Sequence, residues 1–221
     1  SLADVSCFSF HAVKNLTTAE GGAVCFNLPD DFDHDEIYSD FVTITLHGQS
    51  KDALAKTKKG AWKYDVVSPG YKCNMTDIQA AIGLVELERY NENLGRRKTI
   101  FSAYEKAFSA ESWAILPSHK NSEKTSSYHL YLLRINGINE SERDAIIQEI
   151  FDQDVSVNVH FQPLPLLTAY KNLGYDISDY PIAHNKYQSE ITLPVYYNLT
   201  DDQTRKVIEA VKNAVQKIRT A

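Results

Sequence analysis

One lysine near the start of the chain has surroundings that suit Schiff-base chemistry. Lys14 follows Ser9 by five residues, and Ser9 lies at the end of an apolar run. The pair Gly21-Gly22 then permits a tight return of the chain. A lysine beside an apolar strand end is partly dehydrated, which favours its neutral amine. Such an amine can condense with an aldehyde cofactor, and the Ser9 hydroxyl can bind a phosphate of that cofactor. A solvated surface lysine is the alternative interpretation from the residues alone.

Runs of β-branched and aromatic residues predict short strands on both sides of this lysine. They cover residues 5–10, 22–26 and 41–46, and a polar, acidic stretch separates the last two. Residues 48–63 are rich in lysine and predict an exposed loop or a short helix. The charges of residues 51–63 could steer a diphosphate, but a solvated loop explains them equally well.

Two capping boxes predict where helices begin. Thr76 precedes Gln79 by three residues, and Thr200 precedes Gln203 by three. The first helical pattern continues to Phe108 with a break near Gly95. Two apolar stripes are expected to be buried, namely Ile78, Ile82, Val85 and Leu94 in the first pattern, and Val207, Ile208, Val211, Val215 and Ile218 in the last helix.

Helix and strand patterns alternate through the rest of the chain. Residues 128–135 and 155–161 predict strands, and residues 141–152 predict a helix. This alternation indicates an α/β or α+β class. We expect two domains, with a boundary that divides residues 1–109 from residues 110–221.

The composition excludes several classes of protein. The chain has 221 residues and a formal charge of −6, which argues against a broad nucleic-acid surface. No apolar run reaches the ~20 residues that span a bilayer, and no signal peptide is recognisable. Cys7, Cys25 and Cys73 lack zinc-site spacing, so we expect no metal site and three buried or half-buried thiols in a reducing cytoplasm.

Residues 9–22 closely resemble the lysine segment of a known enzyme family, the DegT/DnrJ/EryC1/StrS sugar aminotransferases. That segment has a pattern like SFHxxKNxxxxEGG, and Ala19 stands where glycine is commoner. The family depends on pyridoxal phosphate and has the aspartate aminotransferase type-I fold. The resemblance therefore implies that this chain is the C-terminal part of the large domain followed by a small α+β domain.

Further segments continue the resemblance in order along essentially the whole chain. Residues 70–81 look like the family's GYKYNMTDIQAA, with Cys73 in place of the usual tyrosine. Shorter matches are His47-Gly48 with Lys51-Asp52, residues 129–131, residues 159–163, and Leu193-Pro194 before the last helix.

The resemblance implies roles for three residues in binding pyridoxal phosphate. Lys14 would form the Schiff base with the cofactor and later move a proton as general base and acid. Ser9 would bind the cofactor phosphate. Asn74 would reach the phosphate of the neighbouring subunit's cofactor in a homodimer. The start of a helix at Asn74 independently favours an anion, although an ordinary capping residue explains Asn74 equally well.

Other motif residues have less definite roles. The resemblance places His160 near the nucleotide sugar, but a histidine that ends a strand is often simply packed. Tyr71 could line the substrate entrance or merely pack. His11 lies among Phe10, Ala12 and Val13, so a satisfied core histidine is the better interpretation.

The implied activity is amination of a nucleotide-linked keto-sugar for a surface polysaccharide, with glutamate as the amino donor. A dehydratase branch of the family carries histidine in place of the lysine, so Lys14 argues against that branch. Family members are nearly twice as long, and the missing half would hold most of the cofactor cradle. We therefore expect this chain alone to bind pyridoxal phosphate weakly or not at all. The alternative is a non-catalytic interaction or dimerisation module of the same fold.

Overall fold

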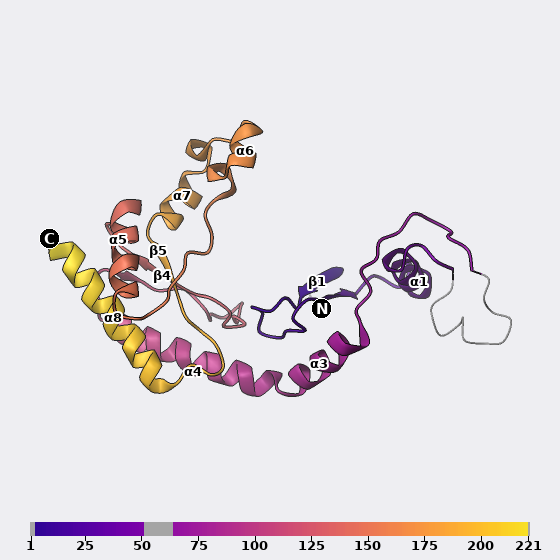
Figure 1. Cartoon of the computed structure of the whole chain (residues 1–221), viewed down its shortest axis with the longest axis horizontal. Helices are drawn as coiled ribbons and strands as arrows, with labels where there is room; N and C mark the ends of the chain where they lie inside the picture. Colours follow the sequence, from indigo (N-terminus) through magenta and orange to yellow (C-terminus); the bar gives the residue numbers. More distant parts are fainter. Residues whose placement is uncertain (1–2, 51–63, 221) are drawn as a thin grey trace. The chain divides into compact units, whose positions relative to one another are not determined.

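The computed structural model describes residues 3–50 and 64–220, which form two compact units (Figure 1). Unit 1 extends to Tyr90, and unit 2 begins at Asn91. The domain boundary expected between residues 109 and 110 falls inside unit 2 and stays a prediction. Of the exposed loop or short helix expected over residues 48–63, residues 51–63 lie outside the described residues, and they include Lys51-Asp52 of the family resemblance.

The described part of unit 1 contains a two-stranded antiparallel hairpin and two helices. The strands are β1 (Val5–Ser9) and β2 (Gly22–Phe26), with Ser9 opposite Gly22 in the register. The helices are α1 (His34–Thr45) and α3 (Asp77–Glu88). Both strands lie where the β-branched runs predict them.

The strand expected over residues 41–46 is wrong, because residues 41–45 are the last turns of α1. The helix begins at the N-cap Asp33, whose carboxylate accepts hydrogen bonds from the N–H groups of Asp35 and Glu36. Asp35 and Glu36 also place negative charge at the positive end of the helix dipole. A helix started in this way continues through the β-branched run, since strand propensity depends strongly on context.

The capping box at the start of α3 is confirmed. The Thr76 hydroxyl accepts from the Gln79 N–H at 3.3 Å, and the Gln79 Oε1 accepts from the Thr76 N–H at 3.0 Å. The helix stops before Arg89, and α4 (Tyr90–Phe108) follows. The break expected near Gly95 is therefore wrong. Gly95 lies inside α4, and a glycine is tolerated inside a helix at a cost of about 1 kcal/mol relative to alanine.

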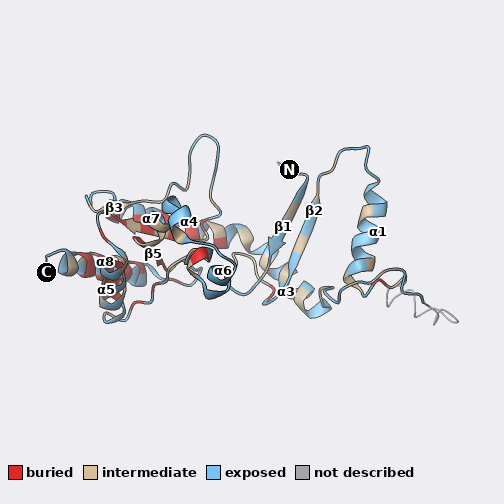
Figure 2. Ribbon diagram, turned by 90° about the horizontal axis from the view of Figure 1, so that it is seen from above, coloured by how far each residue is buried: buried red, intermediate tan, exposed pale blue. Residues whose placement is uncertain are grey.

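The buried stripe expected on α3 is wrong. Ile78 is 76% exposed, and Ile82 and Val85 are also exposed. Only Thr18 and Gly48 are buried among the described residues of unit 1, which is why its elements are drawn in the exposed and intermediate colours in Figure 2. No other element within the described part of unit 1 covers the apolar side of this helix. Leu94, on α4, does pack partly buried against the core of unit 2.

The cysteines are not buried as expected. Cys7, Cys25 and Cys73 are exposed free thiols. Cys7 lies on β1 and Cys25 on β2, and the apolar neighbours Phe8 and Val24 on the same strands are exposed as well. Cysteine usually behaves as a small buried hydrophobic residue, but the cysteines on this hairpin stay exposed because no other element in the described part of unit 1 covers them.

Unit 2 is built on a three-stranded antiparallel sheet in the order β3-β4-β5. The strands are β3 (Ala114–Ile115), β4 (Tyr131–Ile135) and β5 (Glu190–Leu193). The helices besides α4 are α5 (Glu140–Phe151), α6 (Thr168–Asn172), α7 (Pro181–Tyr187) and α8 (Asp201–Thr220), with short 3-10 turns at Leu164–Leu166 and Ile177–Asp179.

Most predictions for unit 2 agree with these elements. The strand at residues 128–135 is present but begins at Tyr131, and the helix at residues 141–152 begins one residue early, after a capping box at Asn139. The strand expected over residues 155–161 is wrong, since only Asn158 forms an isolated bridge, to Thr192 of β5. The capping box at Thr200 is confirmed by reciprocal hydrogen bonds with Gln203.

The core of unit 2 joins helices α4 and α8 to the sheet. The Phe101 and Tyr104 rings of α4 contact the Tyr131 ring of β4 edge-on, with centroids 5.0 and 5.1 Å apart. On α8 the expected stripe is confirmed, with Val207, Val211 and Val215 buried and Ile208 and Ile218 partly buried. Figure 2 shows these buried residues gathered in unit 2.

The two core tyrosines make a matched pair for a stability test. The Tyr104 hydroxyl donates to the Pro194 carbonyl at 2.8 Å, whereas the buried Tyr131 hydroxyl has no hydrogen-bond partner among the described residues. We expect Tyr104→Phe to lower the free energy of unfolding by about 1 kcal/mol and Tyr131→Phe to leave it unchanged or raise it by about 1 kcal/mol. Urea unfolding followed by circular dichroism measures both. An equal decrease in the free energy of unfolding of the two variants would contradict this prediction.

Candidate active site

Lys14 lies in the loop of residues 10–21 that joins β1 to β2, here called the lysine loop. The loop closes on itself through backbone hydrogen bonds. The Phe10 N–H donates to the Gly21 carbonyl at 2.8 Å, and the Thr18 N–H donates to the Phe10 carbonyl at 2.9 Å. The ends of the loop are thereby fixed to the hairpin that carries Ser9.

The two glycines at the end of the loop are required by close approach of other atoms. A Cβ atom at Gly21 would lie 2.4 Å from the Thr18 Oγ1, and one at Gly22 would lie 2.6 Å from the Phe8 carbonyl oxygen. Neither contact is tolerable for a side chain. The tight return expected from the Gly-Gly pair is therefore confirmed.

Lys14 and Ser9 both have reactive groups that are not committed elsewhere. Lys14 is half-buried, and its Nζ makes no ion pair or hydrogen bond within residues 3–50 and 64–220. The exposed Ser9 Oγ accepts one long hydrogen bond, of 3.4 Å, from the His11 N–H, so its own hydrogen can be donated to another group. An amine and a hydroxyl on one loop suit an aldehyde and a phosphate, so these residues fit pyridoxal phosphate.

His11 is not a core histidine, contrary to the preferred interpretation of the sequence. Its side chain is 49% exposed, and its Nε2 lies 3.6 Å from a carboxylate oxygen of Glu20. The neighbouring Val13 is also exposed, so this part of the loop has no core around it among the described residues.

Helix α3 supports the lysine loop through contacts that sequence reasoning missed. The Gln79 side chain donates from Nε2 to the Glu20 carbonyl at 2.8 Å. Thr18 is 1% exposed, and a Cβ atom at Gly83 would lie 3.0 Å from its methyl group. A glycine inside a helical pattern often marks such a close approach, so Gly83 was the available signal.

Asn74 lies two residues before the N-cap of α3, where helix N–H groups favour an anion. Its Oδ1 accepts a hydrogen bond from the Lys72 Nζ. Lys72, which sequence reasoning did not single out, therefore adds a positive charge beside Asn74. Asp77, in the first turn of α3, opposes this charge in part. The pair can still present an amide donor and an ammonium to a phosphate.

Tyr71 is held by its backbone and has an exposed ring. Its N–H donates to the Ile44 carbonyl at 2.7 Å, and its carbonyl accepts from the His47 N–H at 2.8 Å. The side chain is 74% exposed, which does not fit the interpretation that Tyr71 merely packs among the described residues.

His160 belongs to unit 2, whereas Ser9, Lys14, Asn74 and Tyr71 all belong to unit 1. His160 is half-buried beside β5. Its N–H donates to Glu190 at 2.9 Å, and its Nδ1 lies 2.8 Å from the Thr192 hydroxyl oxygen. Burial raises the pKa of the Glu190 carboxyl, although hydrogen bonds from Thr192 and His160 and the charge of Arg143 act in the opposite direction.

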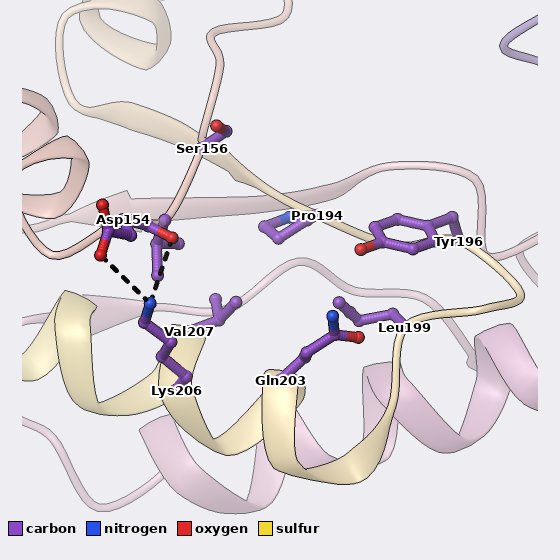
Figure 3. Close-up of a pocket in the computed structure, with 9 residues that line it drawn as sticks. Asp154, Ser156, Pro194, Tyr196, Leu199, Gln203, Lys206 and Val207 are labelled. Atoms are coloured by element: carbon purple, nitrogen blue, oxygen red, sulfur yellow. Dashed lines mark hydrogen bonds and ion pairs between the residues drawn. The ribbon is translucent and has the colours of Figure 1, made fainter.

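A pocket of about 320 Å³ lies elsewhere in unit 2, beside the first turns of α8 (Figure 3). The Lys206 Nζ points across it to Asp154, 3.8 Å from the carboxylate and 3.4 Å from the carbonyl oxygen. None of the site residues predicted from the sequence lines this pocket.

Two further properties concern the described part of the chain. It contains no group of three or more histidine, cysteine, aspartate or glutamate residues placed to hold a metal ion. None of the helices within it has both the length and the apolar character needed to cross a membrane.

Ala19 gives a direct test of strain in the lysine loop. Its φ of 66° lies in the left-handed region, where an L-residue costs about 1–2 kcal/mol relative to glycine. We expect Ala19→Gly to stabilise the loop by about 0.5–1 kcal/mol after the entropy cost of glycine, so that the Phe10 and Thr18 amides exchange hydrogen roughly two- to five-fold more slowly.

Ala12→Gly in the same loop is the matched control, because Ala12 is not among the residues with positive φ. This variant should exchange the same amides at an equal or faster rate. Faster exchange in Ala19→Gly would show that the left-handed residue does not strain the loop.

The raised pKa of the Glu190 carboxyl predicts how the stability of the fold depends on pH. Because its folded-state pKa is raised, the protonated carboxyl favours the folded state, and this stabilisation is lost as pH rises through the folded pKa. We expect the free energy of unfolding of the unmodified chain, relative to Glu190→Gln, to fall from below pH 4.5 to neutral pH. Urea unfolding of both proteins across this pH range measures the difference in their free energies of unfolding. A difference that rises with pH would contradict the prediction.

Comparison with known proteins shows relatives along nearly the whole chain. Residues 1–212 match the DegT/DnrJ/EryC1/StrS aminotransferase family. The spore coat polysaccharide biosynthesis protein SpsC of Bacillus subtilis is 36% identical over 98% of this chain and 55% of its own length. The UDP-4-amino-4,6-dideoxy-N-acetyl-beta-L-altrosamine transaminase of Campylobacter jejuni is 28% identical over 99% of this chain and 54% of its own.

A solved structure confirms the predicted fold class. Spr1654 of Streptococcus pneumoniae, a candidate sugar aminotransferase solved in its PMP form, superposes with a TM-score of 0.93 at 49% identity. The match covers 99% of this chain and 54% of that one, and Spr1654 has also been solved in its PLP form. The chain thus spans about half the length of the relatives it matches. It belongs to the DegT/DnrJ/EryC1/StrS aminotransferase family.

Proposed function

We propose that the protein carrying this chain transfers an amino group from glutamate to a keto group of a nucleotide-linked sugar, with pyridoxal phosphate as cofactor. The observation that carries this proposal is the half-buried Lys14 amine, which has no ion pair among the described residues and follows the Ser9 hydroxyl in one closed loop. The substrate class is supported by the names of two relatives, a UDP-amino-sugar transaminase and a polysaccharide biosynthesis protein.

Lys14 and Ser9 of unit 1 each have a definite role in the proposed reaction. Pyridoxal phosphate, when bound, supplies an aldehyde that carries the amino group and a ring that takes up electrons. Lys14 would hold the cofactor through its Nζ, and the same amine, once free, would serve as the general base and acid that moves a proton in the reaction. Ser9 donates its hydroxyl hydrogen to the phosphate.

We further propose a homodimer in which Asn74 reaches the phosphate bound by the neighbouring subunit. Its amide Nδ2 and the adjacent Lys72 ammonium are both donors, and both precede the start of α3. The exposed Tyr71 and the half-buried His160 are our candidates for contact with the nucleotide sugar. Three exposed free thiols fit a reducing compartment, so we place the reaction in the cytoplasm.

The 221-residue chain by itself should bind pyridoxal phosphate weakly. Its relatives are nearly twice as long, and unit 1 leaves Ile78, Leu84 and Leu87 of α3 largely exposed. A cofactor held by one loop and one helix end has few enclosing groups to exclude water. The same exposed face favours the second candidate function, a non-catalytic module that binds another protein through α3.

Covalent attachment of pyridoxal phosphate distinguishes the aminotransferase from the non-catalytic module. The test compares the chain alone with the chain joined to the part of Spr1654 that precedes the matched region. Each protein is mixed with pyridoxal phosphate and reduced with borohydride, and the modified lysine is found by peptide mass spectrometry. We expect strong visible absorbance and labelling of Lys14 in the joined protein and at least ten-fold weaker labelling in the chain alone.

Two variants make the result specific. Lys14→Arg should abolish both the absorbance and the label, whereas Lys72→Arg should keep Lys14 as the labelled residue. Adding glutamate to the joined protein should remove the visible absorbance and release one 2-oxoglutarate per site. The enzyme proposal is overturned if the joined protein folds but the label falls on other lysines, or survives in Lys14→Arg.

A further inference from the structure

The turn between β4 and α5 in unit 2 carries the only asparagine–glycine pair of the chain, Asn136-Gly137. Both residues are exposed, and they directly follow Ile135, the last residue of β4. Gly137 has a φ of 75°, in the left-handed region that glycine adopts without steric cost. A glycine after an asparagine also leaves its backbone nitrogen accessible to the asparagine side chain, because no Cβ atom shields it.

The two groups that face each other across this pair are not held by other parts of the molecule. The Gly137 N–H and the Asn136 side-chain amide make no hydrogen bond within residues 3–50 and 64–220. A Cβ atom at Gly137 would have nothing within 4 Å beyond its chain neighbours, so the turn has open space around it. The Asn136 N–H, in contrast, donates to the Trp113 carbonyl at 2.7 Å and holds the start of the turn against the sheet.

Arg219 places a positive charge on the peptide group that joins Asn136 to Gly137. Its Nη1 donates to the Asn136 carbonyl oxygen at 2.8 Å, from the last turn of α8. When the Gly137 nitrogen loses its proton, the negative charge is shared with this carbonyl oxygen. A guanidinium stays protonated and donates strongly to an anionic oxygen, so Arg219 stabilises the nucleophilic form of the Gly137 nitrogen. Among the described residues, no carboxylate pairs with Arg219 and neutralises it.

We propose that Asn136 is a site of spontaneous deamidation in the folded protein and that Arg219 promotes the reaction. The Gly137 nitrogen attacks the Asn136 Cγ, and a bond forms between these two atoms. The bond from Cγ to the side-chain nitrogen breaks, and this nitrogen leaves as ammonia with the proton that Gly137 has lost. Water then opens the resulting five-membered imide at either of its two carbonyl groups. The product is aspartate or isoaspartate at position 136, and no oxidant or cofactor takes part.

Either product changes the charge and the local structure of unit 2. Each adds one carboxylate to a chain whose formal charge is −6, beside the Arg219 guanidinium. Isoaspartate also inserts the side-chain CH₂ group into the backbone, between the amide that is bonded to Trp113 and Asn139, the N-cap of α5. We therefore expect the isoaspartate form to unfold at a lower urea concentration than the unmodified chain.

The test follows the reaction in the 221-residue chain, incubated at slightly alkaline pH with neither cofactor nor substrate. Peptide mass spectrometry locates each replacement of an amide NH₂ by OH, and labelling with protein isoaspartate methyltransferase identifies isoaspartate. We expect Asn136 to deamidate roughly ten-fold or more faster than the other asparagines of the folded chain. Its rate in the folded chain should equal or exceed its rate in the same chain unfolded in urea, where the contact with Arg219 is lost.

A matched pair of variants separates the Arg219 contact from a general effect of charge. Arg219→Met removes the donor to the Asn136 carbonyl and should slow the reaction roughly two- to ten-fold. Lys217→Met removes a positive charge from the same turn of α8, but Lys217 pairs with Glu149 at 2.7 Å, so its rate should be unchanged. In urea, both variants and the unmodified chain should react at one rate.

Circular dichroism shows whether each variant is folded, and Lys217 and Arg219 are exposed, so neither substitution removes a core side chain. A slower reaction of Asn136 in the folded chain than in urea would overturn the proposal, as would equal rates in folded Arg219→Met and Lys217→Met. The reaction is measured without pyridoxal phosphate, so its outcome is independent of the lysine-labelling experiment.

Discussion

The close approach of the lysine loop to helix α3 is the constraint on which the candidate active site depends. Thr18 fills the space that Gly83 leaves on the helix, and the Gln79 amide donates to the Glu20 carbonyl. Both contacts join segments about 60 residues apart, so the position of the loop is set by tertiary contacts and not by its own turns alone. Gln79 serves both purposes, because its oxygen caps α3 while its nitrogen holds the loop. The loop that carries Lys14 is thereby held against α3, the helix that Asn74 precedes in the sequence.

The two units differ in how much of their apolar surface is buried. Unit 2 has a continuous core in which α4 and α8 pack against a three-stranded sheet, and its helices can hold their positions without further support. Unit 1 carries the lysine loop but buries only Thr18 and Gly48 among its described residues. Local stability follows buried apolar contacts, so the lysine loop is expected to open more readily than the core of unit 2. Relatives of nearly twice the length have further chain available to cover such a surface.

The sequence predicted those features that depend on neighbouring residues and missed those that depend on distant ones. The capping boxes at Thr76 and Thr200 were predictable because the two partners are three residues apart and satisfy each other. The strand expected at residues 41–46 was wrong because the cap at Asp33, eight residues earlier, determines the structure of the run. The α3 stripe was wrong because periodicity shows which side of a helix is apolar but not whether anything covers it. The pairing of Glu190 with His160, 30 residues apart, had no local signal at all.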